Sequence, residues 1–138
     1  MNRAEAALLI APFYDALNLP ATKDVAALIE SATGPDWRSY TFDAVSAGRD
    51  EFVNQVIGFG KAVPDLSYDL KEVFVDSDRI IVRSAASGTP AGDFLGVPHS
   101  GKRFAIMTID IHTVQDGKIV KTQHVEDWAS AVRQLKGQ

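Results

Sequence analysis

The spacing of hydrophobic residues changes about half-way along the chain. In the first half they recur every three or four residues, which is typical of helices with one buried face. From residue 66 onward β-branched and aromatic residues become frequent and mostly alternate with polar ones, as in strands whose successive side chains point to opposite faces. The expected helices cover residues 3–17, about 22–31, 49–63 and 128–135, the last with only a turn or two. The expected strands cover residues 37–42, 66–75, 79–87 and two runs within 103–128.

This order of elements predicts an α+β fold. Three helices come first and a run of antiparallel strands follows, so we expect the helices to pack on the concave face of a curved antiparallel or mixed sheet. Such an arrangement encloses a cone, and ligand pockets favour that kind of mouth. With 138 residues, the chain is expected to form a single domain over residues 1–138. Residues 88–101 hold four glycines and two prolines and are expected to form a long loop or short edge strands.

The ribbon of residues 103–128 carries the candidate chemistry. Asp116-Gly117 predicts a two-residue hairpin turn, because both central residues of a type I′ turn need a positive φ. A two-residue turn pairs Val114 with Ile119, and counting outward pairs His112 with Lys121. One face then collects Ile106, Thr108, Asp110, His112, Val114, Ile119, Lys121, Gln123, Val125 and Asp127. The other face takes Met107, Ile109, Ile111, Thr113, Val120, Thr122, His124 and Glu126.

Asp127 and His112 share a face in this count, so this face is where we expect acid/base chemistry. A carboxylate in an apolar pocket has a raised pKa and can remove a proton next to a carbonyl, while an imidazole shares that proton or polarises the oxygen. Two alternatives stay open. Asp127 can simply cap the last helix, and a one-residue shift in register would bring His124 to the pocket instead. Asp110 is predicted to line the pocket or, alternatively, to pair with a nearby cation.

The amino-acid composition excludes several classes of function. The net charge of −4 argues against nucleic acid, which needs a basic surface. The chain has no cysteine, which fits a cytoplasmic protein and removes thiolate chemistry. The three histidines do not have a metal-binding spacing, so no metal site is expected. No run of residues is apolar enough for a signal peptide or a membrane span.

Several motifs together resemble the SnoaL-like polyketide (ester) cyclase family, part of the nuclear transport factor 2-like superfamily of α+β cones. The resemblance covers nearly the whole chain and rests on Gly92–Pro98, Ser100–Lys102, Ile109–His112, Asp116–Val120, His124–Trp128 and Gln134–Leu135. It implies an intramolecular aldol cyclisation without a cofactor, in which a carboxylate of the last strand and a histidine of the preceding strand act together. Asp127 and His112 match those positions. Many members carry Trp where this chain has Gln123.

The expected partner is therefore a hydrophobic small molecule with a carbonyl group, bound in the cone. Gln123, Tyr14, Phe59 and Phe94 are expected to line the pocket together with Asp110. The outer face of the sheet is expected to form a homodimer contact, as is common in this superfamily. Two other functions remain open: an epoxide hydrolase of the limonene type, which needs a cluster of acid, amide and arginine, and a binding or dimerisation module without catalysis.

Overall fold

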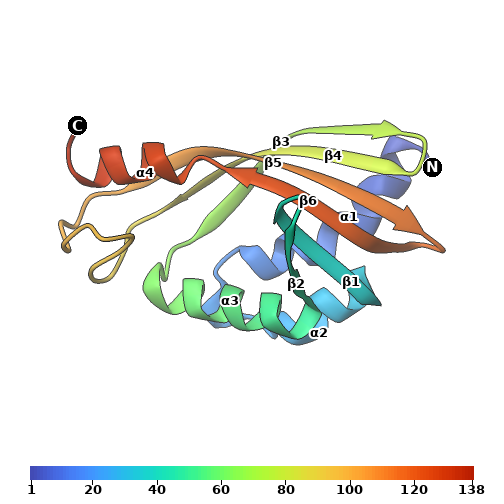
Figure 1. The fold of residues 1–138 in the computed structure, drawn as a ribbon, viewed down its shortest axis with the longest axis horizontal. Helices are drawn as coiled ribbons and strands as arrows, with labels where there is room; N and C mark the ends of the chain where they lie inside the picture. The colour runs from blue at the N-terminus through green and yellow to red at the C-terminus, as the bar shows by residue number, and fades with distance from the viewer.

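A curved six-stranded sheet covered by helices on its concave side forms the protein. The computed structural model describes all residues from 1 to 138. The helices are α1 (Arg3–Leu17), the short 3-10 helix η1 (Pro20–Thr22), α2 (Val25–Ala32), α3 (Arg49–Ala62) and α4 (Trp128–Leu135). The strands are β1 (Thr33–Phe42), β2 (Val45–Gly48), β3 (Ser67–Asp76), β4 (Arg79–Gly88), β5 (Phe104–Gln115) and β6 (Lys118–Glu126). The predicted α+β fold is confirmed (Figure 1).

The strands lie in the order β2-β1-β6-β5-β4-β3. All neighbours are antiparallel except β1 and β6, which run parallel, so the sheet is mixed. In Figure 1 strands β3 to β6 run across the top of the molecule, β1 and β2 descend below them, and α2 and α3 lie at the bottom. Helix α4 lies at the left, where β6 ends and β5 begins. No helix combines the length and the apolar character needed to cross a bilayer.

Local sequence explains where several elements begin. Asn2 and Glu5 form a capping box that satisfies backbone N–H groups at the start of α1. Asp24 caps α2 by accepting a hydrogen bond from the Ala27 amide. Acidic residues in the first turn and Lys61 in the last turn of α3 match the helix dipole. These local signals agree with the elements predicted from spacing.

The first two strands differ from the prediction. Val45–Gly48, for which no strand was predicted, form the edge strand β2, paired with β1. The strand predicted at residues 37–42 begins earlier, at Thr33, because Thr33 already pairs with Ile119 of β6. The Gly34-Pro35 sequence is typical of a turn, but here it lies in β1, whose pairing with β6 is irregular between Thr33 and Arg38.

The hairpin between β5 and β6 has the predicted turn but not the predicted register. Asp116 and Gly117 both have positive φ, 52° and 74°, and Val114 pairs with Ile119 as expected. One residue beyond that pair, Val120 is inserted as a β-bulge, so that His112 pairs with Thr122 and not with Lys121. A bulge places two residues opposite one and turns every later side chain to the other face. The predicted faces of β6 from residue 121 onward are therefore wrong.

Candidate active site

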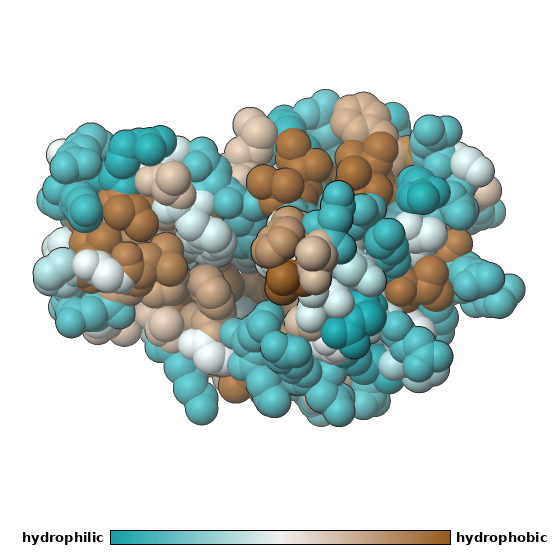
Figure 2. Space-filling view, viewed as in Figure 1, coloured by the Kyte–Doolittle hydropathy of each residue, from teal (hydrophilic) through white to brown (hydrophobic).

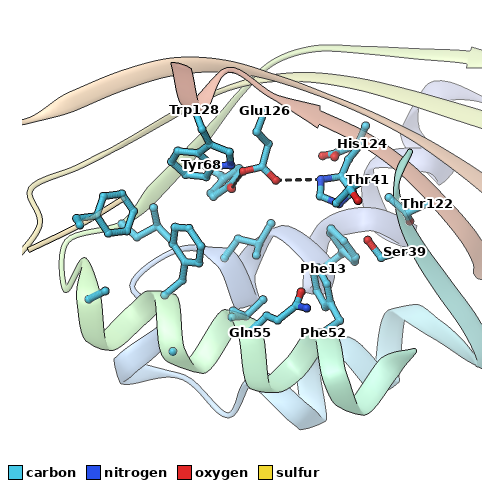
Figure 3. A pocket seen from close by; sticks show the side chains of 18 residues that line it. Phe13, Ser39, Thr41, Phe52, Gln55, Tyr68, Thr122, His124, Glu126 and Trp128 are labelled. Carbon is cyan, nitrogen blue, oxygen red and sulfur yellow. Dashed lines mark hydrogen bonds and ion pairs between the residues drawn. The ribbon is translucent and has the colours of Figure 1, made fainter. Parts of the chain in front are cut away.

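A cavity of about 460 Å³ lies between α3 and the concave face of the sheet. Figure 2 shows a hollow near the centre of this side of the molecule, bordered by hydrophobic side chains. Aromatic and aliphatic groups make up most of its wall, and the polar groups gather on the sheet side (Figure 3). The lining residues are Phe13, Leu17, Ser39, Thr41, Phe52, Gln55, Val56, Gly58, Phe59, Ala62, Leu66, Tyr68, Phe94, Asp110, Thr122, His124, Glu126 and Trp128.

His124 and Glu126 form an ion pair on the wall of this cavity. The Nδ1 atom of His124 lies 2.9 Å from Oε1 of Glu126, and the two side chains are only 17% and 16% exposed. The other carboxylate oxygen, Oε2, accepts a hydrogen bond of 3.0 Å from the hydroxyl of Tyr68 on β3. Both residues alternate along β6 with Val125, which points outward and is 70% exposed. The ring nitrogen Nε2 of His124 has no protein partner.

The pKa of His124 is set by two opposing effects. Burial disfavours the charged imidazolium, but the hydrogen bond and the negative charge of Glu126 outweigh burial, and Asp110 adds to their effect. The pKa of His124 is therefore raised above its ordinary value of 6.5. The protonated ring, a hydrogen-bond donor, is thus favoured over the neutral one beside this apolar cavity.

Asp110 lies next to this pair on the neighbouring strand. It pairs with His124 in the β5–β6 register, lines the cavity and is only 6% exposed. Burial raises the pKa of Asp110 to about 6, although a hydrogen bond from Tyr14 and the charge of His124 act in the opposite direction. The Tyr14 hydroxyl donates this bond to Oδ2 at 2.6 Å. Asp110 is thus a carboxylate that ionises close to neutral pH and has strong basicity for its type.

His112 and Tyr14, both predicted at the site, lie behind the cavity wall. His112 is completely buried and Tyr14 is 3% exposed, and neither lines the cavity. The imidazole of His112 contacts the hydroxyls of Tyr14 and Thr122, each at 2.8 Å. Its ring also meets the Phe13 ring edge to face, with 5.0 Å between the ring centroids. Burial lowers the pKa of His112 to about 3, so this ring is neutral at physiological pH.

Asp127 and Gln123 do not line the cavity, contrary to the prediction. Asp127 does not line the cavity; it caps α4, where Oδ1 accepts from the Ser130 amide at 3.1 Å and Oδ2 from the Ser130 hydroxyl at 2.6 Å. Those hydrogen bonds from Ser130 lower the pKa of Asp127, which makes it a weaker base. Gln123 lies on the outer face of the sheet, beside Ile111 and Tyr40. The physical reason for both errors is the bulge at Val120.

Phe59 and Phe94, both predicted to line the pocket, lie in the cavity wall. Their rings meet edge to face, with centroids 5.6 Å apart, and Trp128 packs against both. The sequence reasoning missed Glu126 and Tyr68 as cavity residues. Glu126 was placed on the opposite face by the uncorrected register, whereas Tyr68 carries no local signal that distinguishes it from a core tyrosine.

The cluster required by the epoxide hydrolase alternative does not form in this cavity. Gln123 faces outward, Arg38 bonds to Ser46, and Arg49 bonds to Thr33 at the base of β1. Neither arginine lines the cavity. Nowhere in the chain do three or more histidine, aspartate and glutamate side chains come together in a way that could hold a metal ion.

Comparison with known proteins identifies the class. The family model of the SnoaL-like polyketide cyclases matches residues 9–135, so the chain belongs to this family. Among solved structures, TsrD from Streptomyces laurentii is 28% identical, with a TM-score of 0.84 over 100% of this chain and 99% of its own. No functionally curated protein matches the sequence.

More distant structures share the fold. IdmH from Streptomyces antibioticus, a candidate polyketide cyclase, is 23% identical, with a TM-score of 0.81 over 94% of this chain and 97% of its own. An epoxide hydrolase of the limonene type from M. tuberculosis is 13% identical, with a TM-score of 0.71 over 97% of this chain and 91% of its own. At these identities the likeness concerns the cone-shaped architecture alone.

Proposed function

We propose that the protein catalyses acid/base chemistry on a hydrophobic carbonyl compound without a cofactor, as a cyclase that closes a ring by an aldol-type step or as an isomerase. The observation that carries this proposal is the pairing of Asp110 with His124 on adjacent strands at the wall of an apolar cavity. A carboxylate and an imidazole of opposite charge, side by side and shielded from water, provide a base and an acid within reach of one ligand.

Asp110 acts as the base in this proposal. Its pKa of about 6 leaves it ionised at neutral pH, yet basic enough to remove a proton from the carbon next to a carbonyl. Its atom Oδ2 is occupied by Tyr14, so Oδ1 takes the proton. The electron pair of the broken C–H bond moves into the carbonyl group and forms an enolate.

His124 acts as the acid. Glu126 favours the protonated imidazole, whose Nε2–H can donate a hydrogen bond to the enolate oxygen. In a cyclisation, the enolate carbon then attacks a second carbonyl carbon of the same molecule, and the new alkoxide oxygen takes a proton from His124. Transfer of the proton on Asp110 to the neutral His124 restores both groups, so no proton is gained or lost overall.

This assignment exchanges the strands on which the family resemblance places the two groups. The carboxylate is on β5 and the histidine on β6, the last strand, whereas the resemblance implied the reverse. Glu126 and Tyr68 position His124 and do not themselves need to touch the substrate. The aromatic wall of Phe13, Phe52 and Trp128 favours a flat, ring-containing substrate.

Exchange of carbon-bound protons tests the proposal without knowledge of the natural substrate. 2-Tetralone, an aromatic ketone with acidic protons next to its carbonyl, is incubated with the protein in D₂O, and proton NMR follows their loss. The wild type is expected to accelerate exchange over buffer, and His124→Gln to lower that rate at least tenfold. Gln123→Ala, at the neighbouring position on the outer face, is the matched control and should retain the wild-type rate.

Two results would contradict this proposal, the first its catalysis and the second its acid. If 2-tetralone quenches the tryptophan fluorescence, and therefore binds, but its exchange stays at the buffer rate, the binding-module alternative is favoured. If His124→Gln and Gln123→Ala exchange protons equally fast, the acid is assigned to the wrong residue.

A further inference from the structure

A line of five buried side chains runs from the core to Asp110. Trp37 Nε1 contacts the Thr122 hydroxyl at 3.0 Å, and that hydroxyl contacts Nδ1 of His112 at 2.8 Å. His112 Nε2 contacts the Tyr14 hydroxyl at 2.8 Å, and Tyr14 contacts Asp110 at 2.6 Å. These residues come from β1, β6, β5 and α1, and Trp37, Thr122, His112 and Tyr14 are each at most 3% exposed.

The ionised carboxylate of Asp110 fixes the direction of the bonds behind it. A carboxylate can only accept, so the Tyr14 proton points to Asp110, and the Tyr14 oxygen accepts from Nε2 of His112. A neutral imidazole that carries its proton at Nε2 accepts at Nδ1, so the Thr122 hydroxyl donates to Nδ1. The indole N–H of Trp37 can only donate, and the Thr122 oxygen accepts it, which leaves the Thr122 proton for His112.

We propose that Trp37, Thr122, His112 and Tyr14 form a one-directional chain of donors that holds Asp110 as an oriented carboxylate, with Oδ1 left for the substrate. These four are positioning residues, and the inference rests on the proposed role of Asp110 as the base. The chain explains why a histidine is completely buried without an ionic partner. Neutral His112 is the one link that both accepts and donates through a rigid ring, so it transmits the direction from Thr122 to Tyr14.

Other groups also act on the charge of Asp110, and the experiment must separate them from the chain. Tyr68 approaches from β3, and His124 and Glu126 from β6; Tyr14 comes from α1 and His112 from the same strand as Asp110. Glu126 disfavours ionisation of Asp110, whereas His124 and the Tyr14 bond favour it. Only the Tyr14 bond belongs to the chain, so a change confined to Tyr14 is diagnostic.

The tautomer of His112 is the first measurement. In protein labelled with ¹⁵N-histidine, the nitrogen chemical shifts of the wild type should give neutral His112 with its proton on Nε2 from pH 7 to pH 8, where Asp110 is ionised. In Tyr14→Phe the Nε2 proton loses its acceptor, and the proton should move to Nδ1, where the Thr122 oxygen can accept it. In Thr122→Val, the matched variant at the other side of the ring, the proton should remain on Nε2.

Titration of Asp110 is the second measurement, followed by ¹³C NMR of its carboxyl carbon. Loss of a hydrogen bond to a charged group in Tyr14→Phe should raise the pKa of Asp110 by about one unit or more. The acid limb of tetralone exchange should move upward with it. This titration tests the Tyr14–Asp110 bond, while the tautomer tests the link through His112.

The inference is overturned if wild-type His112 carries its proton on Nδ1, or if Tyr14→Phe leaves the pKa of Asp110 unchanged. If Tyr14→Phe does not fold, the wild-type tautomer and the Thr122→Val tautomer still decide the direction. Failure of the proposed function is seen separately, because absent tetralone exchange affects neither the tautomer nor the carboxyl titration.

Discussion

Replacing Asp110 with asparagine should make the protein more stable and should do so in a pH-dependent way. The carboxyl group of Asp110 has a pKa of about 6 in the fold, against 3.8 as its ordinary value. The folded protein therefore binds this proton more tightly than the unfolded chain does, so stability is lost as the pH rises from about 4 to above 6. Asparagine keeps the size of the side chain and an oxygen that can accept from Tyr14, but it has no charge to bury.

The size of the effect follows from the shift. About two pKa units correspond to about 3 kcal/mol of unfolding free energy, which Asp110→Asn should regain at pH 7.5. At pH 5 the folded carboxyl is already mostly protonated, so the gain should be about half as large. Urea unfolding of both proteins at the two pH values, followed by tryptophan fluorescence, measures the difference. The change in unfolding free energy at each pH is compared between variants, so other titrating groups such as His112 cancel.

Asp127→Asn is the matched control for that experiment. Asp127 is exposed and caps α4, and asparagine caps helices about as well as aspartate. Its stability should match that of wild type at both pH values. If Asp110→Asn is no more stable than wild type at pH 7.5, or if its gain does not shrink at pH 5, the carboxylate is not held in the desolvated state on which the mechanism depends.

Three further predictions concern pH, a helix glycine and assembly. Tetralone exchange should follow a bell-shaped pH profile, with an acid limb near 6 from Asp110 and an alkaline limb above 6.5 from His124; a flat profile would contradict these roles. Gly58 lies inside α3, and no atom lies near the place where a Cβ would stand, whereas Gly60 is crowded by Pro20. Gly58→Ala should therefore raise the free energy of unfolding by roughly 1 kcal/mol, and a lower value in urea unfolding would contradict this. Ile109 is 41% exposed on the outer face of the sheet, and we propose that this face forms a homodimer contact. Light scattering should show a dimer for the wild type and a monomer for Ile109→Glu, and a monomeric wild type would rule the contact out.

The sequence was sufficient for the class of fold, because long periodic segments and the hairpin at Asp116-Gly117 depend on local chemistry. It also identified the ribbon that carries the site and placed Asp110 on its inner face. It could not reveal the bulge at Val120, which accompanies an irregular pairing of β1 with β6 between residues far apart in the chain. A bulge inserts one residue, so counting every second residue across it gives the wrong face. Gln123 and His124 were therefore predicted on each other's faces.

Distant contacts account for the other differences. Tyr14 was expected beside the ligand, but it packs one layer deeper, where only the fold brings it to Asp110 and His112. Tyr68 reaches Glu126 across a sequence separation of 58 residues. No pattern of spacing within one element predicts such pairs, since they are set by how α1 and β3 lie against the sheet.

The most direct test of the central claim compares two carboxylates that differ in burial. The exchange of 2-tetralone protons is measured in D₂O for Asp110→Asn and Asp127→Asn, each of which replaces one carboxylate with an amide. The buried, cavity-lining Asp110 is expected to be essential, with its variant at the buffer rate, while Asp127→Asn should exchange protons as fast as wild type. Full exchange activity in Asp110→Asn, or its loss in Asp127→Asn alone, would contradict the account.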